Sequence, residues 1–359
     1  MPNYANLALA ADRLVHNQGP QTTPIWKGLD YNQIMVARIQ SEWSLAYRQD
    51  PSDFIGDQWF PLVDVKFIAG LYPKWSMETF FTDYVTAWRP GTMPAQGDIK
   101  LDDHGNFVCQ RYACQIPLAD DIPYVADPGI DPQYATNAFL TDVMQLHKER
   151  IIAGQYFQSS ATGGSNVWGT NWAGVTSGPN STQFVRFDDD ANSNPRKVIK
   201  NIKVALKEAT GKTPNTALMG EQVFEVLRIH PQLIQWYQAT AEGVRTITEL
   251  NEQKLAQALG LDKIMVGKAM YNTAKPGAAV DLDWIFGKHL WVGYVDTPGP
   301  MKALAGMNLS FNQPLGGFDT AFTTVPDLLT HAEYYQAFQC YAPVIMGEKL
   351  GAMLATAIS

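Results

Sequence analysis

The sequence lacks the marks of a secreted, membrane-spanning or disulfide-stabilised protein. Its 359 residues contain only three cysteines (Cys109, Cys114 and Cys340), too few for a disulfide framework in a chain of this length. No run of about eighteen apolar residues is present, so no transmembrane helix is predicted. Residues 1–20 hold no apolar stretch of the kind that a signal peptide needs. We therefore expect synthesis in a reducing cytoplasm and no membrane partner.

Charge is also scarce. Only 17% of the residues are charged, and the net charge is −8. A protein that reads nucleic acid normally carries a basic face, so the acidic balance argues against that class; it does not exclude a protein that only encloses nucleic acid. Hydrophobic residues make up 46% of the chain, which is ample for a buried core. The length suits two or three domains, or one domain with large extensions.

Catalytic and metal-binding motifs are missing as well. The chain contains no H-E-x-x-H, no G-x-S-x-G and no complete phosphate loop. G-K-T at 211–213 follows an expected helix, whereas a phosphate site needs a helix N-terminus. The six histidines are scattered, and Cys109 and Cys114 would face opposite sides of a strand, so zinc is not expected. We name no catalytic, cofactor-binding or metal-binding residue, and we expect no cofactor and no enzymatic activity.

Two charged clusters each allow two interpretations. Asp188-Asp189-Asp190 is either a divalent-cation site or a solvated loop, and we favour the loop because a hard cation needs further fixed oxygen ligands. Lys148, Glu149 and Arg150 are consecutive in an expected helix and point in different directions, so we interpret them as surface charge. An enzyme is still not excluded, because catalytic residues converge in space and not in sequence.

Aromatic residues, by contrast, are plentiful, and the chain has ten tryptophans. Large rings in turn-rich segments either form subunit interfaces or fasten loops onto their own domain, and the sequence supports the two interpretations equally. The tryptophans in such segments are Trp26, Trp59, Trp75, Trp88, Trp168 and Trp172.

The first half of the chain predicts an irregular arm, a helix and a β-rich region. Glycine and proline punctuate residues 1–30, and four-residue apolar spacing indicates a helix at about 32–49. Residues 58–125 have strand composition, including 59–70, and contain a long two-stranded excursion. D-D-H-G-N at 102–106 is interpreted as a hairpin-type turn. A lone hairpin of that size is marginal in water, so we expect it to lie against something, such as another subunit.

The longest helix is predicted at 131–158, with Asp131 as N-cap and Pro132 at the first helical position. A second helix follows Asn194 and ends at Gly211, a residue suited to a left-handed C-cap. Short elements then alternate, as in a compact α/β section. Strands are predicted at 216–220, 263–271 and 285–295, helices at 221–229 and 248–259, and mixed, strand-like sequence at 318–359.

Three segments of this α/β section, in their order, closely resemble the axial domain of tailed-phage major capsid proteins. They are T-P-N-T-A-L-M-G-E-Q-V-F-E-V-L-R-I-H-P-Q-L (213–233), the stretch 247–274 with L-A-Q-A-L-G-L-D-K-I-M-V-G-K-A-M-Y, and W-I-F-G-K-H-L-W-V-G-Y-V (284–295). No single motif is diagnostic, and the specific part is the order that the segments share with that family.

Other stretches match the same family in the same order. F-F-T-D (80–83) with R-P-G-T (89–92) is similar to the extended-loop region of one branch of the family. The long helix followed by V-W-G-T (167–170) is similar to the family's spine helix and the segment after it. The resemblance spans roughly residues 55–300. Residues 159–182 and the segment after 318 match the pattern less well.

The resemblance implies an α+β fold, the capsid fold that tailed phages share with encapsulins and herpesvirus capsid floors. That fold has an N-terminal arm, an extended β-hairpin loop, a peripheral domain with a long spine helix, and an axial α/β domain. On this chain the implied parts are the arm (1–58), the peripheral domain (59–195) with the extended loop (72–112) and the spine helix (131–158), the axial domain (196–316), and a return to the peripheral domain (317–359).

The implied function is structural. Subunits of the family form hexamers and pentamers that tile an icosahedral shell around double-stranded DNA, so the implied location is the virion, after assembly in the host cytoplasm. The implied partners are other copies of the chain and a portal, with separate scaffolding or decoration proteins as further candidates. Some relatives crosslink through a lysine in the extended loop; Lys74 and Lys100 lie in or near it, and nothing in the sequence assigns either that chemistry.

Two alternatives stay open beside the phage shell. One is an encapsulin-like cellular nanocompartment with the same fold, whose chains are usually shorter. The other is a soluble α/β enzyme or binding protein with an unrecognised site. The size of the purified protein separates the shell interpretations from the last one, because a monomer under all conditions would count against both shells.

Overall fold

The computed structural model describes most of the chain beyond residue 47. The described residues are 48–75, 77–97, 99, 101–119, 121, 132–240, 248–275, 277–299, 302–312, 319–327, 329 and 331–359. Nearly all of them belong to one compact unit, residues 48–118 and 136–359, which is the unit described below. The predicted arm and the helix at 32–49 fall almost wholly outside the described residues, as do Asp131 and Lys100.

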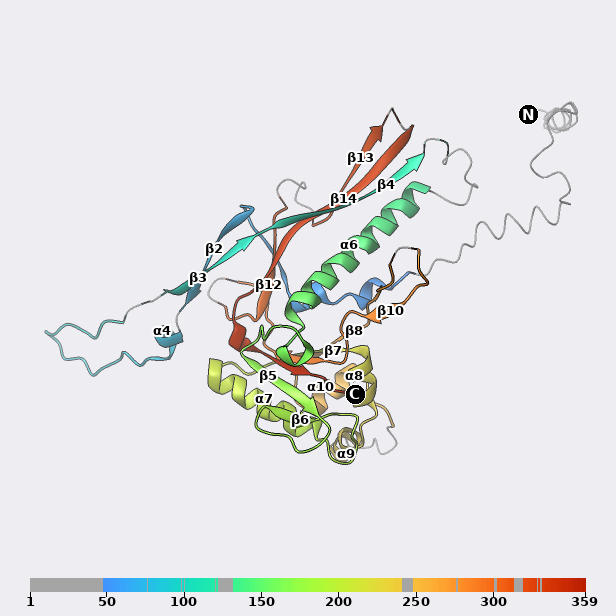
Figure 1. Cartoon of the computed structure of the whole chain (residues 1–359). Coiled ribbons are helices and arrows are strands. Elements are labelled where there is room, and N and C mark those ends of the chain that lie inside the picture. Colours follow the sequence, from blue (N-terminus) through green and yellow to red (C-terminus); the bar gives the residue numbers. More distant parts are fainter. Residues whose placement is uncertain are drawn as a thin grey trace, which may run out of the picture. The chain divides into compact units, whose positions relative to one another are not determined.

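A six-stranded sheet with the order β6-β5-β15-β11-β7-β8 forms the centre of this unit (Figure 1). β7–β8, β5–β15 and β5–β6 are parallel pairs, whereas β11 runs antiparallel to both β7 and β15. The strands are β5 (Thr170–Val175), β6 (Gln183–Val185), β7 (Thr216–Gly220), β8 (Lys263–Gly267), β11 (Leu290–Gly293) and β15 (Gly351–Ala355).

Four helices cover one face of this sheet: α7 (Pro195–Thr210), α8 (Glu221–Arg228), α9 (Pro231–Thr240) and α10 (Glu252–Leu259). Side chains of successive strand residues point to opposite faces, so Ala217 and Met219 lie in the core with the helices, while Leu218 lies in the core on the other side. α7 shows why these residues form a helix. The Asn194 side chain accepts the N–H of Lys197, and Gly211 ends the helix at φ 71°.

The opposite face carries an aromatic core centred on Trp59. Its ring centroid lies 4.7 Å from that of Phe60, 5.4 Å from that of Trp291 and 5.9 Å from that of Phe157. Trp59 and Trp168 therefore fasten segments onto the chain's own core, whereas Trp88 is 56% exposed. The interpretation that rings fasten loops onto their own domain is thus confirmed for Trp59 and Trp168, and a subunit interface stays a prediction for Trp88.

A second sheet has the order β1-β12-β14-β13, and β4 also pairs with β14. The longest helix, α6 (Pro132–Tyr156), runs beside β4 and β14 (Figure 1), and its Leu140 and Met144 lie in one core with Leu118 and Tyr335. The strands are β1 (Leu62–Asp64), β4 (Gln110–Ala119), β12 (Gly306–Ser310), β13 (Ala321–Asp327) and β14 (Ala332–Ile345).

Two hairpins complete the unit, with several single helical turns. β2 (Ala69–Trp75) pairs antiparallel with β3 (Leu101–Val108), and α4 (Met77–Phe81) follows β2. β9 (Met270–Asn272) pairs with β10 (Leu282–Trp284). The short turns are η1 (Pro51–Asp53), α3 (Gly56–Trp59), η2 (Ser160–Thr162) and η4 (Glu348–Leu350). No described helix is long and apolar enough to cross a membrane.

The turn predicted at 102–106 is wrong. These residues lie inside β3, where His104 pairs with Pro73 and Gly105 pairs with Tyr72. A Cβ atom at Gly105 would lie 2.0 Å from the Tyr72 ring, so this glycine serves close cross-strand packing and not a turn.

The strand composition of 59–70 corresponds to strand structure over only part of this range. Residues 56–59 form the helical turn α3, and strand structure is confined to 62–64 and, from residue 69, to β2. The turn is held by the distant carboxylate of Glu149, a contact that local composition does not reveal.

Most of the other predicted elements are confirmed. α6, α7, β7 and α8 match their predicted ranges closely, and α10 with its C-cap Gly260 occupies most of 248–259. The predicted strand 263–271 is divided into β8 and β9, and 285–295 contains the four-residue strand β11. α9 was not predicted.

The six-stranded sheet extends beyond the range predicted for the axial domain. β5 and β6 precede residue 196, and β15 follows residue 316, because the sheet recruits strands from both sides of that range. The tail from 317 enters the second sheet as β13 and β14 and then the first as β15. The division into domains stays a prediction.

Candidate functional site

The most enzyme-like contact is a hydrogen bond between Ser193 and His230. Ser193 Oγ lies 2.8 Å from His230 Nε2, and both residues are fully buried. No described residue partners Nδ1 of His230, so no acid orients the ring as a nucleophile–base pair requires. Burial lowers the pKa of His230, only partly opposed by Asp190. The pair joins the loop before α7 to the start of α9 and has no access for a substrate.

Asp188-Asp189-Asp190 lies in the loop between β6 and α7. Asp189 accepts the backbone N–H groups of Ala191 and Asn192 at 3.2 and 3.1 Å, and Asp188 accepts that of Ser359 at 3.1 Å. The bonds of Asp189 are those of a turn, whereas Asp188 ties the loop to the distant backbone of Ser359. Within the described residues, no group of three or more His, Cys, Asp or Glu side chains is placed to hold a metal ion.

The cysteines are free thiols, and two of them lie in the core between β3–β4 and β12–β14. Burial, with a smaller effect of Cys340, raises the pKa of Cys109 to about 11. A thiol with so high a pKa stays protonated and is a poor nucleophile.

Lys148 is buried, which overturns its interpretation as surface charge. Its Nζ lies 2.7 Å from a carboxylate oxygen of Asp57 and 3.1 Å from one of Asp319, and 5.8 Å from the ring centroid of Tyr341. Burial lowers the pKa of Lys148, but the two carboxylates outweigh it and the net pKa is raised. The ammonium therefore ties α6 to α3 and to the segment before β13.

Glu149, the next residue of α6, is also buried. Its carboxylate accepts the backbone N–H of Ile55 at 2.9 Å and that of Gly56 at 2.7 Å, at the start of α3. Burial raises the pKa of Glu149 to about 7, although the two N–H groups oppose this effect. The sequence could not show that Lys148 and Glu149 are buried. Neighbouring helical residues point in different directions, and both can be buried only when distant segments supply a partner for each side chain.

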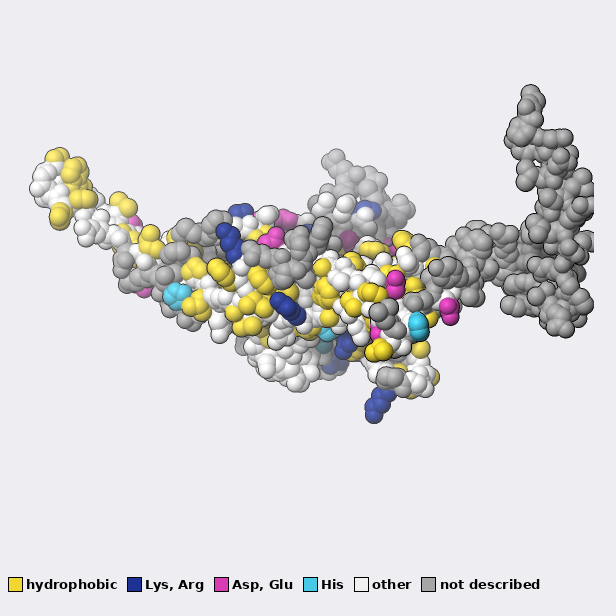
Figure 2. Space-filling model, turned by 90° about the horizontal axis from the view of Figure 1, so that it is seen from above, with side chains coloured by type: hydrophobic (Ala, Val, Ile, Leu, Met, Phe, Trp, Pro, Cys, Tyr) yellow, Lys and Arg dark blue, Asp and Glu magenta, His cyan; other side chains and the backbone are white. Residues whose placement is uncertain are grey.

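Large apolar side chains are exposed on the β2–β3 hairpin and on the loop that joins its strands. Val85 is 85% exposed and Met93 87%, and Phe67, just before β2, is 73% exposed. Figure 2 shows apolar side chains gathered at the tip of this loop, which Figure 1 draws at the far left. Apolar groups collected on one projecting segment mark an interaction surface. The other members are Leu71, Met77, Phe80, Phe81, Trp88, Ile99 and Val108.

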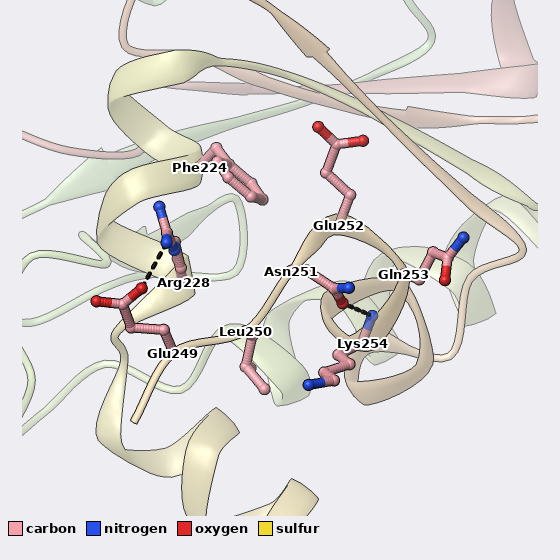
Figure 3. A pocket seen from close by; sticks show the side chains of 8 residues that line it. All are labelled: Phe224, Arg228, Glu249, Leu250, Asn251, Glu252, Gln253 and Lys254. Atoms are coloured by element: carbon pink, nitrogen blue, oxygen red, sulfur yellow. Dashed lines mark hydrogen bonds and ion pairs between the residues drawn. The ribbon is translucent and has the colours of Figure 1, made fainter. Parts of the chain in front are cut away.

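A hollow of about 520 Å³ lies between α8 and the start of α10 (Figure 3). The Arg228 guanidinium pairs with Glu225 at 3.0 Å and with Glu249, while the Asn251 side chain accepts the N–H of Lys254. The charged groups of the hollow thus largely neutralise one another, and the Asn251 amide caps α10.

Known structures resemble this chain over nearly its whole length. A phage-related protein from Bordetella bronchiseptica RB50 has a TM-score of 0.60 at 18% identity and covers 90% of this chain and 96% of its own. The capsid of cyanophage P-SCSP1u has a TM-score of 0.54 at 12% identity and covers 93% of this chain and 98% of its own. The capsid of a native GTA particle has a TM-score of 0.51 at 10% identity and covers 95% of this chain and 97% of its own.

The chain has the phage capsid fold. The α+β class and the capsid fold predicted from the sequence are thus confirmed. No protein-family model matches the chain. A sequence relative, from Burkholderia phage BcepMu, carries the name "Major capsid protein" and is 26% identical over 239 residues, which cover 65% of this chain and 69% of the relative. The resemblance to capsid proteins stated from the sequence is therefore confirmed.

Proposed function

We propose that this chain is the major capsid protein of a tailed phage, a structural protein and not an enzyme. The observation that carries the proposal is the agreement of its fold with a phage capsid chain over 93% of one and 98% of the other. The name of the Burkholderia phage relative supports the same conclusion. Hexamers and pentamers of the chain would tile an icosahedral shell around double-stranded DNA, in virions assembled in the host cytoplasm.

The proposed parts follow the capsid fold. Residues 1–58 are the arm, the hairpin β2–β3 with its loop is the extended loop, α6 is the spine helix, and the six-stranded sheet with its helices forms the axial domain. A portal, and separate scaffolding or decoration proteins, are the partners that such a shell would need.

Exposed apolar groups supply the physical reason for assembly. The loop between β2 and β3 leaves Val85, Trp88 and Met93 in water, and a neighbouring subunit that covered them would gain about 25 cal/mol for each Å² of apolar surface removed. A contact of one patch with a different patch on the next copy repeats around an axis, and it closes a ring where the rotation between copies divides a full turn evenly. The loop is therefore proposed to hold neighbouring subunits together.

The loop can be tested without disturbing the sheets. Residues 82–97, between α4 and β3, are replaced by a short Gly-Ser linker, which leaves β2 and β3 intact. We expect a folded, soluble protein that forms no shells by negative-stain microscopy, whereas the full chain forms them. A full chain that stays monomeric under all conditions would contradict the proposal, and an unfolded variant would contradict the assignment of the loop. Shells that contain a cargo enzyme and no DNA would favour the nanocompartment.

A further inference from the structure

A row of basic side chains runs along one side of α7, in a protein of net charge −8. Arg196, Lys200, Lys203 and Lys207 are spaced by four, three and four residues, so they lie above one another on the helix. Between its first and last members the helix rises about 16 Å, at about 1.5 Å per residue. The buried side of α7 is separate from this row and faces the sheet.

The row lines one wall of a groove of about 770 Å³. α9 contributes Trp236, and the C-terminal end of α10 contributes Gly260. The guanidinium carbon of Arg196 lies 4.2 Å from the Trp236 ring centroid, and Lys203 donates a hydrogen bond to the Gly260 carbonyl. Two of the four cations are thus held in fixed positions on the wall, with Lys200 and Lys207 exposed between and beyond them.

The described part of the chain supplies no carboxylate in ion-pair contact with these four side chains. The ion pairs of its described residues involve other cations, such as Lys148, Arg228 and Lys268. Like charges three or four residues apart destabilise a helix, and Arg196 in the first turn opposes the helix dipole. Burial lowers the pKa of Lys203, partly offset by Asp262. A bound polyanion would relieve each of these unfavourable effects.

We propose that this groove binds the phosphate backbone of double-stranded DNA, so that the helical face of the six-stranded sheet faces the packaged DNA. The inference rests on the proposed function and adds a residue-level DNA contact to it. Along about 16 Å of duplex axis each strand carries about five phosphates, at about 3.4 Å per phosphate, so the duplex offers at least one phosphate for each of the four cations. Contacts of this kind carry no sequence information and weaken steeply with salt.

A second copy of the chain is a poorer occupant for the groove. The carboxylates in and beside the hollow between α8 and α10 are already engaged: Glu225 and Glu249 pair with Arg228, and Glu252 lies 3.8 Å from Lys268. In the Asp188–Asp190 loop, Asp189 accepts the backbone N–H of Asn192 and Asp188 accepts that of Ser359. Neither presents a straight, unneutralised row that would match the four cations of α7.

The test uses the unassembled full chain and a fluorescent 25-base-pair duplex of mixed sequence, with anisotropy measured over a series of salt concentrations. We expect the logarithm of the binding constant to fall with the logarithm of salt at a slope of about −3 to −4, the value for about four neutralised phosphates. The double variant K200Q/K207Q is expected to make the slope shallower by about two. The matched control K66Q/K275Q removes the same charge from exposed sites elsewhere and should leave the slope unchanged.

The outcomes separate this inference from the proposed function. The DNA-binding inference is supported if K200Q/K207Q loses DNA affinity and still forms shells by microscopy. The inference is overturned if the full chain does not bind the duplex, or if the control variant loses as much DNA affinity; neither result bears on the proposed shell. Lost shell assembly with unchanged DNA affinity also overturns it, and would reassign the row to a contact between subunits. Binding of poly-glutamate but not of duplex would reassign it to an acidic protein. Circular dichroism checks that each variant is folded.

Discussion

The six-stranded sheet and the β2–β3 hairpin with its loop differ in where they place large apolar side chains. Every residue of β7, β11 and β15 is buried, and both faces of the sheet lie in hydrophobic cores of the same chain. The loop after β2 instead leaves Val85, Trp88 and Met93 mostly in water. The sheet buries its apolar side chains within the chain itself, whereas the loop leaves its large apolar side chains uncovered. Large apolar side chains thus stabilise the fold in one region, and in the other they are the groups that we propose stabilise assembly.

The largest expected effect is a loss of stability in the core of the six-stranded sheet. Trp291→Ala removes a fully buried ring between Trp59 and Trp168 and should lower the free energy of unfolding by about 3–5 kcal/mol. Denaturant unfolding followed by far-UV circular dichroism measures this. The matched variant in the loop is Trp88→Ala, which should stay within about 0.5 kcal/mol of wild type because the ring is exposed. Equal losses in the two variants would abolish the contrast between the regions.

A smaller effect is expected where α6 is tied to α3. Lys148→Ala leaves Asp57 and Asp319 without their cation, and we expect a loss of about 2–3 kcal/mol. This is below the range for a wholly buried pair, because both carboxylates remain partly open to water. Lys268→Ala, which removes an exposed pair with Glu252, is the control and should cost less than about 1 kcal/mol. If the two substitutions cost the same, the Lys148 contacts are not structural.

The smallest effect is a dependence on pH at Glu149. Burial raises the pKa of this carboxyl from 4.5 to about 7 in the folded chain, so the folded state holds the proton more tightly than the unfolded state. The contribution of this proton to the free energy of unfolding is therefore fully present below about pH 4.5 and is lost as the pH rises towards 7. Between pH 5 and pH 7 the loss is on the order of 2 kcal/mol.

Glu149→Gln removes this ionisation while keeping an oxygen that can accept an N–H group of α3. The difference between wild type and variant in denaturant midpoint should therefore grow in favour of the variant as the pH rises from 5 to 7. A difference that stays constant over this range would show that Glu149 does not titrate there.

Local signals predicted the elements whose ends are marked by their own residues. Asn194, Pro195 and Gly211 delimit α7 as the sequence indicates, because an N-cap, a first-turn proline and a left-handed glycine act within one helical turn. The order of the capsid-like segments then gave the fold, since the order of elements survives where identity has fallen to 12%.

Features that depend on distant partners were missed. Lys148 and Glu149 look like ordinary surface charge until α3 and the segment at Asp319 are brought to them. D-D-H-G-N has the composition of a turn, and only its pairing with β2 shows it to be a strand. The basic row of α7 was hidden for another reason: net charge averages over the whole chain, whereas a binding surface depends on which charges one face collects.

β15 sits near the middle of the six-stranded sheet, between β11 and β5, although it is formed by residues 351–355. The six-stranded sheet can therefore close only after residues 351–355 have been synthesised, long after its first strand, β5. Until then the facing edges of β5 and β11 lack their partner and are open to wrong pairing with other strands. The position of β15 thus makes closure of this sheet a late step in folding.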